Sequence, residues 1–226
     1  MTVHAILFDL DGTLVDTAPD LVAVLNRLLI DSSRPPAAYA VARNHASDGA
    51  LGLIRLGFGC DLPPGSVEDL RDRFLQMYSA ALCVNSRIFE GLSHILDIGS
   101  SYRWGVVTNK PHAMTVPLLA RLGLAERSGS IVSGDSLPQR KPHPAPLLLA
   151  AEELGVRPER CVYIGDAPRD IEAGRAAGMT TIAAAYGYIR PGTDVMSWGA
   201  DLIVRHPAHL SAALAQLTRD DADDAA

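Results

Sequence analysis

The stretch Ala5-Ile6-Leu7-Phe8-Asp9-Leu10-Asp11-Gly12-Thr13-Leu14-Val15-Asp16-Thr17 decides the fold of this chain. Its first four apolar residues predict a strand buried on both faces, because a core helix would not end so soon in Asp and Gly. Alternate residues of an extended chain point the same way, so Asp9 and Asp11 project to one side of the strand end. Open α/β sheets bind their ligands at the carboxyl ends of their strands. The stretch therefore predicts a site built on two carboxylates.

These two carboxylates would repel each other. At a separation of about 4 Å the repulsion is roughly 4 kcal/mol at an effective dielectric near 20. A divalent cation that prefers oxygen ligands, usually Mg²⁺, would offset it, and so would a shared proton. Asp-Gly is also a common turn dipeptide, so both aspartates could be solvated turn residues. The stretch by itself leaves these alternatives open.

The bulk composition argues against several classes of protein. The 226 residues carry a formal net charge of -6 without a basic run, which disfavours a nucleic-acid-binding protein. No segment approaches the roughly 20 apolar residues of a membrane span, and the N-terminus does not resemble a signal peptide. The three cysteines include no C-x-x-C pair, so neither a disulfide framework nor a zinc site is indicated. We expect a cytoplasmic protein with no membrane partner, as a monomer or a homodimer.

Two regions of the chain differ in periodicity. Between residues 15 and 87 apolar residues recur at helical spacing without a strand pattern, which predicts a small all-helical domain inserted after the first strand. From Ile88 onward helices alternate with short apolar strands, which is typical of a doubly wound parallel sheet. We therefore predict an α/β fold with a core over residues 1–14 and 88–226 and an inserted helical domain over 15–87. Residues 218–226 are acidic, and we predict a disordered tail there.

The expected strands of the core are short apolar runs that alternate with amphipathic helices. The strands are expected at residues 104–108, 130–133, 161–165, 180–184 and 201–204. The helices are expected at residues 92–98, 111–122, 145–154 and 169–177. Polar residues of chemical interest lie in several of the loops between these elements.

Two of these loops could bind an anion. Gly105-Val106-Val107-Thr108-Asn109-Lys110-Pro111 ends a buried strand in a hydroxyl and in backbone amides that suit a phosphate. Arg140-Lys141-Pro142-His143-Pro144 fixes a lysine among prolines, where its charge could stabilise a phosphoryl group. Each loop also has an ordinary explanation. A strand ending in Thr-Asn is common, and Lys110 or Lys141 could be a solvated surface residue.

A third segment, Val162-Tyr163-Ile164-Gly165-Asp166-Ala167-Pro168-Arg169-Asp170, is acidic. Asp166 ends a buried strand, Pro168 can start a helix, and Asp170 returns to the same face four residues after Asp166. The dipole at a helix N-terminus favours both negative charges. Helix capping alone would explain Asp166, so the segment is compatible with either a cap or a metal site.

Together, and in this order over about 160 residues, the four segments resemble the four motifs of the haloacid dehalogenase superfamily, in its branch of aspartate-nucleophile phosphatases. The resemblance implies a Rossmann-like core with the helical insertion as a cap. It assigns the attack on phosphorus to Asp9 and the acid–base role to Asp11. Thr108 and the next backbone amide, that of Asn109, would hold the phosphoryl oxygens, while Lys141 would stabilise their charge.

The resemblance also implies a Mg²⁺ site. The metal would be held by the Asp9 carboxylate, the Asp11 backbone carbonyl and Asp166, with Asp170 as a ligand or as a support for one. Members of the family more often have Ser or Asp where this chain has Ala167. We expect this departure to remove one hydrogen-bonding side chain beside the metal.

The whole chain resembles the phosphoglycolate phosphatase branch of the superfamily, including the stretch 104–111 and the ending Tyr186-Gly187-Tyr188. Asn85-Ser86-Arg87-Ile88-Phe89-Glu90-Gly91 and Trp198-Gly199-Ala200-Asp201 are similar to relatives that dephosphorylate N-acetylmuramic acid 6-phosphate. The resemblance implies a small phosphorylated metabolite as the substrate. Which of the two phosphate esters is preferred depends on the cap.

The polar cap loop 43–49 is the expected reader of the leaving group. Its predicted substrate-binding residues are Arg43, Ser47, Asp48 and Gly49. Ser47 and an ionised Asp48 suit sugar hydroxyls, which donate hydrogen bonds to a carboxylate, whereas Asp48 would repel the carboxylate of glycolate. The loop therefore favours N-acetylmuramic acid 6-phosphate. An ordinary solvated loop is the alternative.

Three other classes share part of this pattern. A phosphosugar mutase of the same fold would shield its aspartyl-phosphate from water. A response-regulator receiver also combines Asp, Thr and Lys, but it has roughly half this length and carries its acidic pair before the acceptor strand. A non-catalytic binding protein would be expected to have lost Asp9 or Asp11. The sequence favours the phosphatase.

Overall fold

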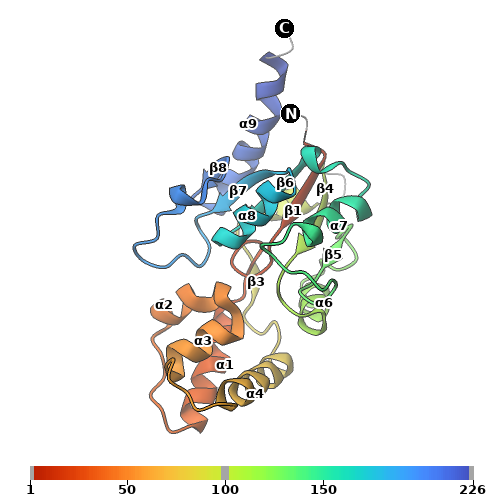
Figure 1. Cartoon of the computed structure of the whole chain (residues 1–226). Coiled ribbons are helices and arrows are strands. Elements are labelled where there is room, and N and C mark those ends of the chain that lie inside the picture. The colour runs from red at the N-terminus through yellow and green to blue at the C-terminus, as the bar shows by residue number, and fades with distance from the viewer. Residues whose placement is uncertain (1–2, 98–101, 224–226) are drawn as a thin grey trace.

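The core of the molecule is a parallel sheet, seen in a computed structural model that describes residues 3–97 and 102–223. Its strands are β1 (Ala5–Phe8), β4 (Arg103–Val107), β5 (Ile131–Val132), β6 (Cys161–Gly165), β7 (Thr180–Ala184) and β8 (Leu202–Val204). Their spatial order is β5-β4-β1-β6-β7-β8, with every neighbouring pair parallel (Figure 1). Phe8 pairs with Val106 on one side and Ile164 on the other, so the three central strands end at one edge.

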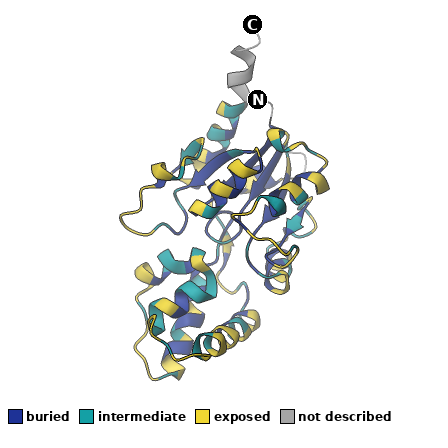
Figure 2. Cartoon of the chain, in the orientation of Figure 1, coloured by how far each residue is buried: buried dark blue, intermediate teal, exposed yellow. Residues whose placement is uncertain are grey.

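Helices cover both faces of this sheet. They are α5 (Ser93–Leu96), α6 (His112–Arg121), α7 (Ala145–Glu153), α8 (Pro168–Ala176) and α9 (Leu210–Asp223). Ala5 and Leu7 of β1 pack in one apolar cluster with α7 and α8, whereas Ile6 and Phe8 pack in another with α5, α6 and α9. The sheet is accordingly buried between layers of half-exposed helices (Figure 2). This burial on both faces explains the unbroken apolar run of β1.

The cap consists of helices inserted between two very short strands. It contains α1 (Ala18–Asp31), α2 (Tyr39–Ala42), the 3-10 helix η1 (Arg43–Asp48), α3 (Gly49–Phe58) and α4 (Ser66–Ala80). The chain enters the cap through β2 (Val15–Asp16) and leaves it through β3 (Arg87–Ile88), which pair as an antiparallel ribbon. The sequence pattern missed this ribbon because its strands of two residues are too short for any periodicity.

A buried carboxylate fastens the first cap helix to the segment that leaves the cap. Asp20 is 3% exposed and accepts hydrogen bonds from the backbone amides of Asn85 (2.8 Å) and Ser86 (3.0 Å). The Ser86 hydroxyl donates to the same carboxylate at 2.6 Å. Buried charges of this kind are stable only when several donors satisfy them. Asp20 therefore joins the start of the first cap helix to the segment through which the chain leaves the cap.

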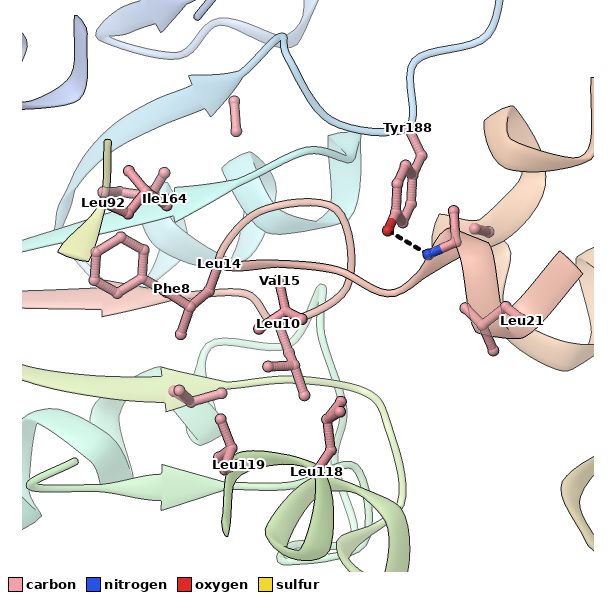
Figure 3. Packing of buried hydrophobic residues seen from close by; sticks show 14 of the residues in the cluster. Phe8, Leu10, Leu14, Val15, Leu21, Leu92, Leu118, Leu119, Ile164 and Tyr188 are labelled. Carbon is pink, nitrogen blue, oxygen red and sulfur yellow. Dashed lines mark hydrogen bonds between the residues drawn. The ribbon is translucent and has the colours of Figure 1, made fainter. Parts of the chain in front are cut away.

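Tyr188, from the loop after β7, holds the linker between core and cap (Figure 3). Its hydroxyl accepts hydrogen bonds from the backbone amides of Thr17 (2.6 Å) and Ala18 (2.8 Å) at the start of α1. It also donates to Asp16 at 2.9 Å. These amides belong to the first turn of the helix, where no carbonyl of the helix is available to them. One core side chain thus sets the angle at which the cap leaves the sheet.

Two sequence predictions concern the ends of helices. The helix expected over residues 92–98 is the shorter α5, and Ile98 lies outside the described residues. The disordered tail expected over 218–226 stays a prediction: α9 runs as far as Asp223, and residues 224–226 lie outside the described residues. Leu210 and Leu214 anchor α9 to the core, and the alanines that follow favour continued helix. Within the described ranges, no helix has the length and apolarity needed to cross a membrane.

Three short 3-10 helices complete the core. They are η2 (Pro158–Arg160), η3 (Val195–Trp198) and η4 (Pro207–His209). Each precedes or follows a strand on the β6 to β8 side of the sheet. They lie in the connections next to these strands and contribute no residue to the site described below.

Candidate active site

The site lies where the carboxyl ends of β4, β1 and β6 face the cap. A cavity of about 1080 Å³ separates the two regions there. Its core wall includes Asp9, Asp11, Thr108, Asn109, Lys110 and Lys141. Its cap wall includes Leu21 and the lining residues between His45 and Tyr78. Arg140, Arg169 and Arg190 of the core add positive charge beside these walls. Four loops distant in sequence therefore meet at one cavity, as expected for adjacent parallel strands.

Lys141 is the most tightly held group of the core wall. Its Nζ lies 2.8 Å from Asp9 Oδ1 and 2.8 Å from Asp170 Oδ1. It also donates to the Val107 carbonyl (2.9 Å) and contacts the Tyr163 hydroxyl (2.7 Å). Burial alone would lower the pKa of this ammonium, but the carboxylates of Asp170 and Asp9 outweigh burial and raise it. Lys141 therefore carries a fixed positive charge directly beside Asp9.

Thr108 and Asn109 hold the second loop of the site. Thr108 is 4% exposed and ends β4, where its backbone amide donates to Val132 at 2.9 Å. The Asn109 side chain donates to the Lys141 carbonyl (3.0 Å) and accepts from the Lys141 amide (3.1 Å). This reciprocal pair fixes the lysine loop against the loop after β4. The backbone amide of Asn109 has no acceptor among the described residues, so it remains available to a phosphoryl oxygen.

Three buried carboxylates form a cluster that suits a metal ion. One oxygen each of Asp9, Asp166 and Asp170 lies within 4.8 Å of the others. Asp166 Oδ2 accepts from the Tyr188 amide at 2.8 Å, whereas Asp166 Oδ1 is buried without any hydrogen-bond partner among the described residues. Burial, then the charges of Asp9 and Asp170, raise the pKa of Asp166 to about 7. An unpaired buried oxygen in an all-carboxylate cluster fits a hard cation.

The glycine of the first motif is required by this cluster. Gly12 has φ +86°, and a Cβ at this position would lie 2.2 Å from Asp166 Oδ2. Any other residue would be strained by the backbone angle and would also displace the carboxylate. The turn after Asp11 is therefore shaped by the approach of the fourth motif.

Asp170 is wholly buried, and both of its carboxylate oxygens contact other groups of the protein. Besides its ion pair with Lys141, its Oδ2 accepts from the Ala167 amide at 3.0 Å, which caps α8. Burial raises the pKa of Asp170, although Lys141 acts in the opposite direction. These contacts tie Asp170, a member of the carboxylate cluster, to Lys141 and to the first turn of α8.

Asp11 points away from the metal cluster toward a buried lysine. Lys110 Nζ lies 3.0 Å and 3.2 Å from the two carboxylate oxygens of Asp11, and the Thr17 hydroxyl donates to Oδ1 at 2.6 Å. Lys110 is 8% exposed, so the alternative of a solvated surface residue is wrong. The third partner atom of Lys110 Nζ is the hydroxyl oxygen of Tyr78, at 3.0 Å. Tyr78 comes from α4 of the cap.

The structure divides the predicted residues of the cap loop into two groups. Ser47, Asp48 and Gly49 line the cavity, but Arg43 does not. The Arg43 guanidinium instead donates to the Gly187 carbonyl at 3.0 Å and stacks on Tyr188, with its Cζ 4.9 Å from the ring centroid. In this structure Arg43 therefore connects cap and core and does not line the cavity.

Ser47 and Asp48 already have protein partners. The Ser47 hydroxyl donates to Asp166 Oδ2 at 2.6 Å, and its carbonyl accepts from Arg169 at 2.5 Å. Asp48 is ion-paired with Arg190. A cap hydroxyl thus reaches the acidic cluster beside Ala167, the position where the sequence had indicated a missing hydrogen-bonding side chain.

The comparisons with known proteins agree with this geometry. The model of the haloacid dehalogenase-like hydrolase family matches residues 3–178. The chain belongs to this family. It is 44% identical to an N-acetylmuramic acid 6-phosphate phosphatase of Pseudomonas aeruginosa, over 93% of this chain and 94% of that protein. It is 41% identical to a phosphoglycolate phosphatase of Xanthomonas campestris, over 92% and 94%.

A solved structure agrees with the fold of this haloacid dehalogenase-like hydrolase. The crystal structure of a predicted phosphoglycolate phosphatase from Haemophilus somnus superposes with a TM-score of 0.81 at 28% identity. The match covers 93% of this chain and 97% of that one, cap included. The Rossmann-like core predicted from the sequence is thereby confirmed.

Proposed function

We propose that this hydrolase is a Mg²⁺-dependent phosphatase whose preferred substrate is N-acetylmuramic acid 6-phosphate. The observation that carries the proposal is the cavity of about 1080 Å³. The charged side chains of its core wall are ion-paired with one another, and they face a cap wall that contains Arg55 and Arg71. Pockets for small ligands usually measure about 300–1000 Å³, so there is room for a sugar ring beyond the phosphate. Relatives of that name in two Pseudomonas species, 44% and 42% identical, support the choice.

The core wall supplies the residues for two successive steps. In the first, Asp9 attacks phosphorus, Asp11 protonates the departing oxygen, and an aspartyl-phosphate forms. In the second, water attacks that phosphorus and Asp11 accepts the proton of the water. The Thr108 hydroxyl and the free amide of Asn109 would orient the phosphoryl oxygens, while Lys141 offsets their charge.

The metal is proposed as Mg²⁺ because every candidate ligand is an oxygen. Asp9, Asp166 and the Asp11 backbone carbonyl would hold it, and Asp170 would either bind it or support those ligands. When bound, it would neutralise the negative charge of the phosphate and of Asp9. The unpaired Asp166 Oδ1 is the feature of this chain that most favours such an ion.

The cap wall would select the leaving group. Arg55 and Arg71 of the cap line the cavity, as does Arg140 of the core, and none of the three pairs with a carboxylate among the described residues. Muramic acid carries a carboxylate on the side of its ring, which unpaired guanidinium groups would attract. Asp48 contributes less than the sequence suggested, because Arg190 already occupies it.

2-Phosphoglycolate is a second candidate, supported by relatives such as the Xanthomonas phosphatase. It also carries a carboxylate, but that group lies close to the phosphate and would leave the cap arginines unoccupied. A free cysteine at each of Cys60, Cys83 and Cys161 suits a reducing cytoplasm.

The test is the ratio of kcat/KM for the two esters, measured by release of inorganic phosphate with Mg²⁺. We expect N-acetylmuramic acid 6-phosphate to be preferred by at least about 10-fold. Preference for 2-phosphoglycolate would refute the substrate assignment and leave the phosphatase intact. Isomerisation of a sugar phosphate without phosphate release would instead indicate a mutase. Asp9→Asn protein serves as the blank in each assay.

A further inference from the structure

The most unusual group outside the predicted motif roles is Lys110. Its ammonium is buried, with a side-chain exposure of 5%, and its partners come from both regions of the molecule. Asp11 of the core lies 3.0 Å away, and the Tyr78 hydroxyl of the cap helix α4 also lies 3.0 Å away. The ammonium also lies 4.5 Å from the centroid of the Tyr78 ring. Lys110 therefore bridges the acid–base residue and the cap.

This bridge depends on the position of the cap. Tyr78 is 1% exposed and packs beside Phe74 of the same helix, so its hydroxyl is placed by the packing of α4. An ammonium in an apolar site is costly unless donors and acceptors surround it. If α4 moved away from the core, Lys110 would lose the hydroxyl and the ring while Asp11 kept its half of the contact. The docked cap thus completes the surroundings of Lys110.

The same contacts fix the orientation of Asp11. Both of its oxygens accept hydrogen bonds from Lys110, and Oδ1 also accepts from the Thr17 hydroxyl at 2.6 Å. All of these bonds are donated to Asp11, so both carboxylate oxygens act as acceptors and the donors fix their orientation. The carboxylate lines the cavity with a side-chain exposure of 18%, so it is open to water on that side.

We infer that Lys110 and Tyr78 are positioning residues that hold Asp11 as the base for hydrolysis of the aspartyl-phosphate, and that they do so when the cap is docked. The inference rests on the proposed phosphatase function. In this step the water oxygen forms a bond to phosphorus while one water proton passes to Asp11. The bond between phosphorus and Asp9 breaks, its electron pair returns to the Asp9 carboxylate, and inorganic phosphate leaves.

A purely structural bridge between cap and core is the competing explanation. It predicts that loss of Lys110 or Tyr78 would impair binding and both chemical steps alike. The inference instead predicts damage confined to the second step, so a test must separate the two. p-Nitrophenyl phosphate does so, because its leaving group departs without a proton and its release can be followed directly.

For this substrate kcat/KM reports the steps through formation of the aspartyl-phosphate, whereas kcat also contains its hydrolysis. In Lys110→Met protein we expect kcat to fall about 100-fold and kcat/KM to stay within about 3-fold of wild type. Nitrophenolate should then appear in an initial burst close to one equivalent of enzyme. Tyr78→Phe should show the same pattern with a fall in kcat of about 10-fold.

Tyr186→Phe is the matched control. In the wild type the Tyr186 hydroxyl donates to the Thr13 carbonyl at 3.0 Å, in the same loop as Asp11, and it does not contact Lys110. This variant should show no burst and an unchanged ratio of kcat to kcat/KM. If Lys110→Met does not fold, Tyr78→Phe decides the question, because it keeps the lysine and the ring.

Two results would overturn the inference. One is an equal fall in kcat and kcat/KM without a burst, which is the pattern of a structural bridge. The other is an unchanged kcat in both variants. Wild-type protein that releases no phosphate in the presence of Mg²⁺ would refute the phosphatase itself, and is thereby distinguished from failure of the positioning role alone.

Discussion

The core wall and the cap wall of the cavity are built in opposite ways. In the core wall Asp9, Thr108 and Lys141 are each about 4% exposed, and Lys141 alone has four protein partners. In the cap wall Arg55 and Arg71 are exposed and lack acidic partners among the described residues. A tightly paired wall preserves geometry, whereas an open wall keeps its charges free for a ligand.

Under the proposed function, this difference assigns the reaction to the core wall and the choice of substrate to the cap wall. Changes in the core wall should affect every phosphate ester equally, since all share the phosphoryl group. Changes in the cap wall should affect esters according to their leaving groups. Substitutions in each wall and removal of the metal can test this assignment of roles.

The largest effect is expected from Asp9→Asn. The variant removes the nucleophile, so kcat should fall by more than about 1000-fold for N-acetylmuramic acid 6-phosphate and p-nitrophenyl phosphate alike. The melting temperature should not fall, because Asn has nearly the same shape and relieves crowding among Asp9, Asp166 and Asp170. Asp61→Asn, at an exposed position, is the control and should keep full activity. A residual kcat above about a thousandth of the wild-type value would show that a group other than Asp9 attacks phosphorus.

Removal of the metal is expected to have the next largest effect. Treatment with EDTA should abolish measurable activity toward both substrates, and added Mg²⁺ should restore it. Phosphate release before and after dialysis into metal-free buffer measures this directly. Activity that survives complete metal removal would mean that the carboxylate cluster of the core wall works without a cation.

Arg71→Ala should separate the two walls. We expect KM for N-acetylmuramic acid 6-phosphate to rise about 10-fold, because a guanidinium that can pair with the substrate carboxylate is lost. The kinetics of p-nitrophenyl phosphate, which has no carboxylate, should not change. Arg27→Ala, on the outer surface of α1 and paired with Asp31, is a matched control in the cap. A parallel loss on both substrates would contradict the assignment of selectivity to the cap wall.

The smallest effect concerns the stability of the metal-free protein. The pKa of Asp166 is raised to about 7, chiefly by burial and then by Asp9 and Asp170, above the value of about 3.9 in an unfolded chain. The folded state therefore binds more protons between these values, and this contribution to stability is lost as the pH rises through about 7. The melting temperature should decline between pH 5 and pH 8 by a few degrees more than that of Asp166→Asn protein.

Magnesium should reverse this decline, because it binds the ionised carboxylates and so stabilises the folded state more at pH 8 than at pH 5. Melting curves with and without Mg²⁺ at the two values of pH provide the measurement. If the metal-free wild type and Asp166→Asn respond identically to pH, the raised pKa of Asp166 has no bearing on stability.

Much of the core wall could be predicted from the sequence. Asp9, Thr108 and Asp166 each follow a buried strand, and parallel strands bring their carboxyl ends to one edge whatever the details of packing. The β6 and β7 boundaries were also predicted, because short apolar runs flanked by polar residues define such strands clearly. The position of the carboxylate cluster follows from the same topology, because the order of the motifs along the chain determines which strand ends are neighbours.

The cap contacts could not be predicted in this way. Ser47 meets Asp166 across a separation of 119 residues, and Lys110 meets Tyr78 across 32. Neither contact follows from a periodic pattern or from strand order. Each depends on the angle at which α1 leaves the core, which Tyr188 and Asp20 fix through backbone hydrogen bonds.

The sequence alone therefore determined which residues form the core wall of the candidate site, because local strand ends and parallel pairing are sufficient to bring them together. Only the tertiary structure decided what Lys110, Tyr78, Arg43 and Ser47 do. A lysine after a strand is compatible with solvent, substrate or a buried partner, and its environment depends on which surface packs over it. For Lys110 that surface is the cap, and the free energy of burying its charge is balanced by partners from both regions.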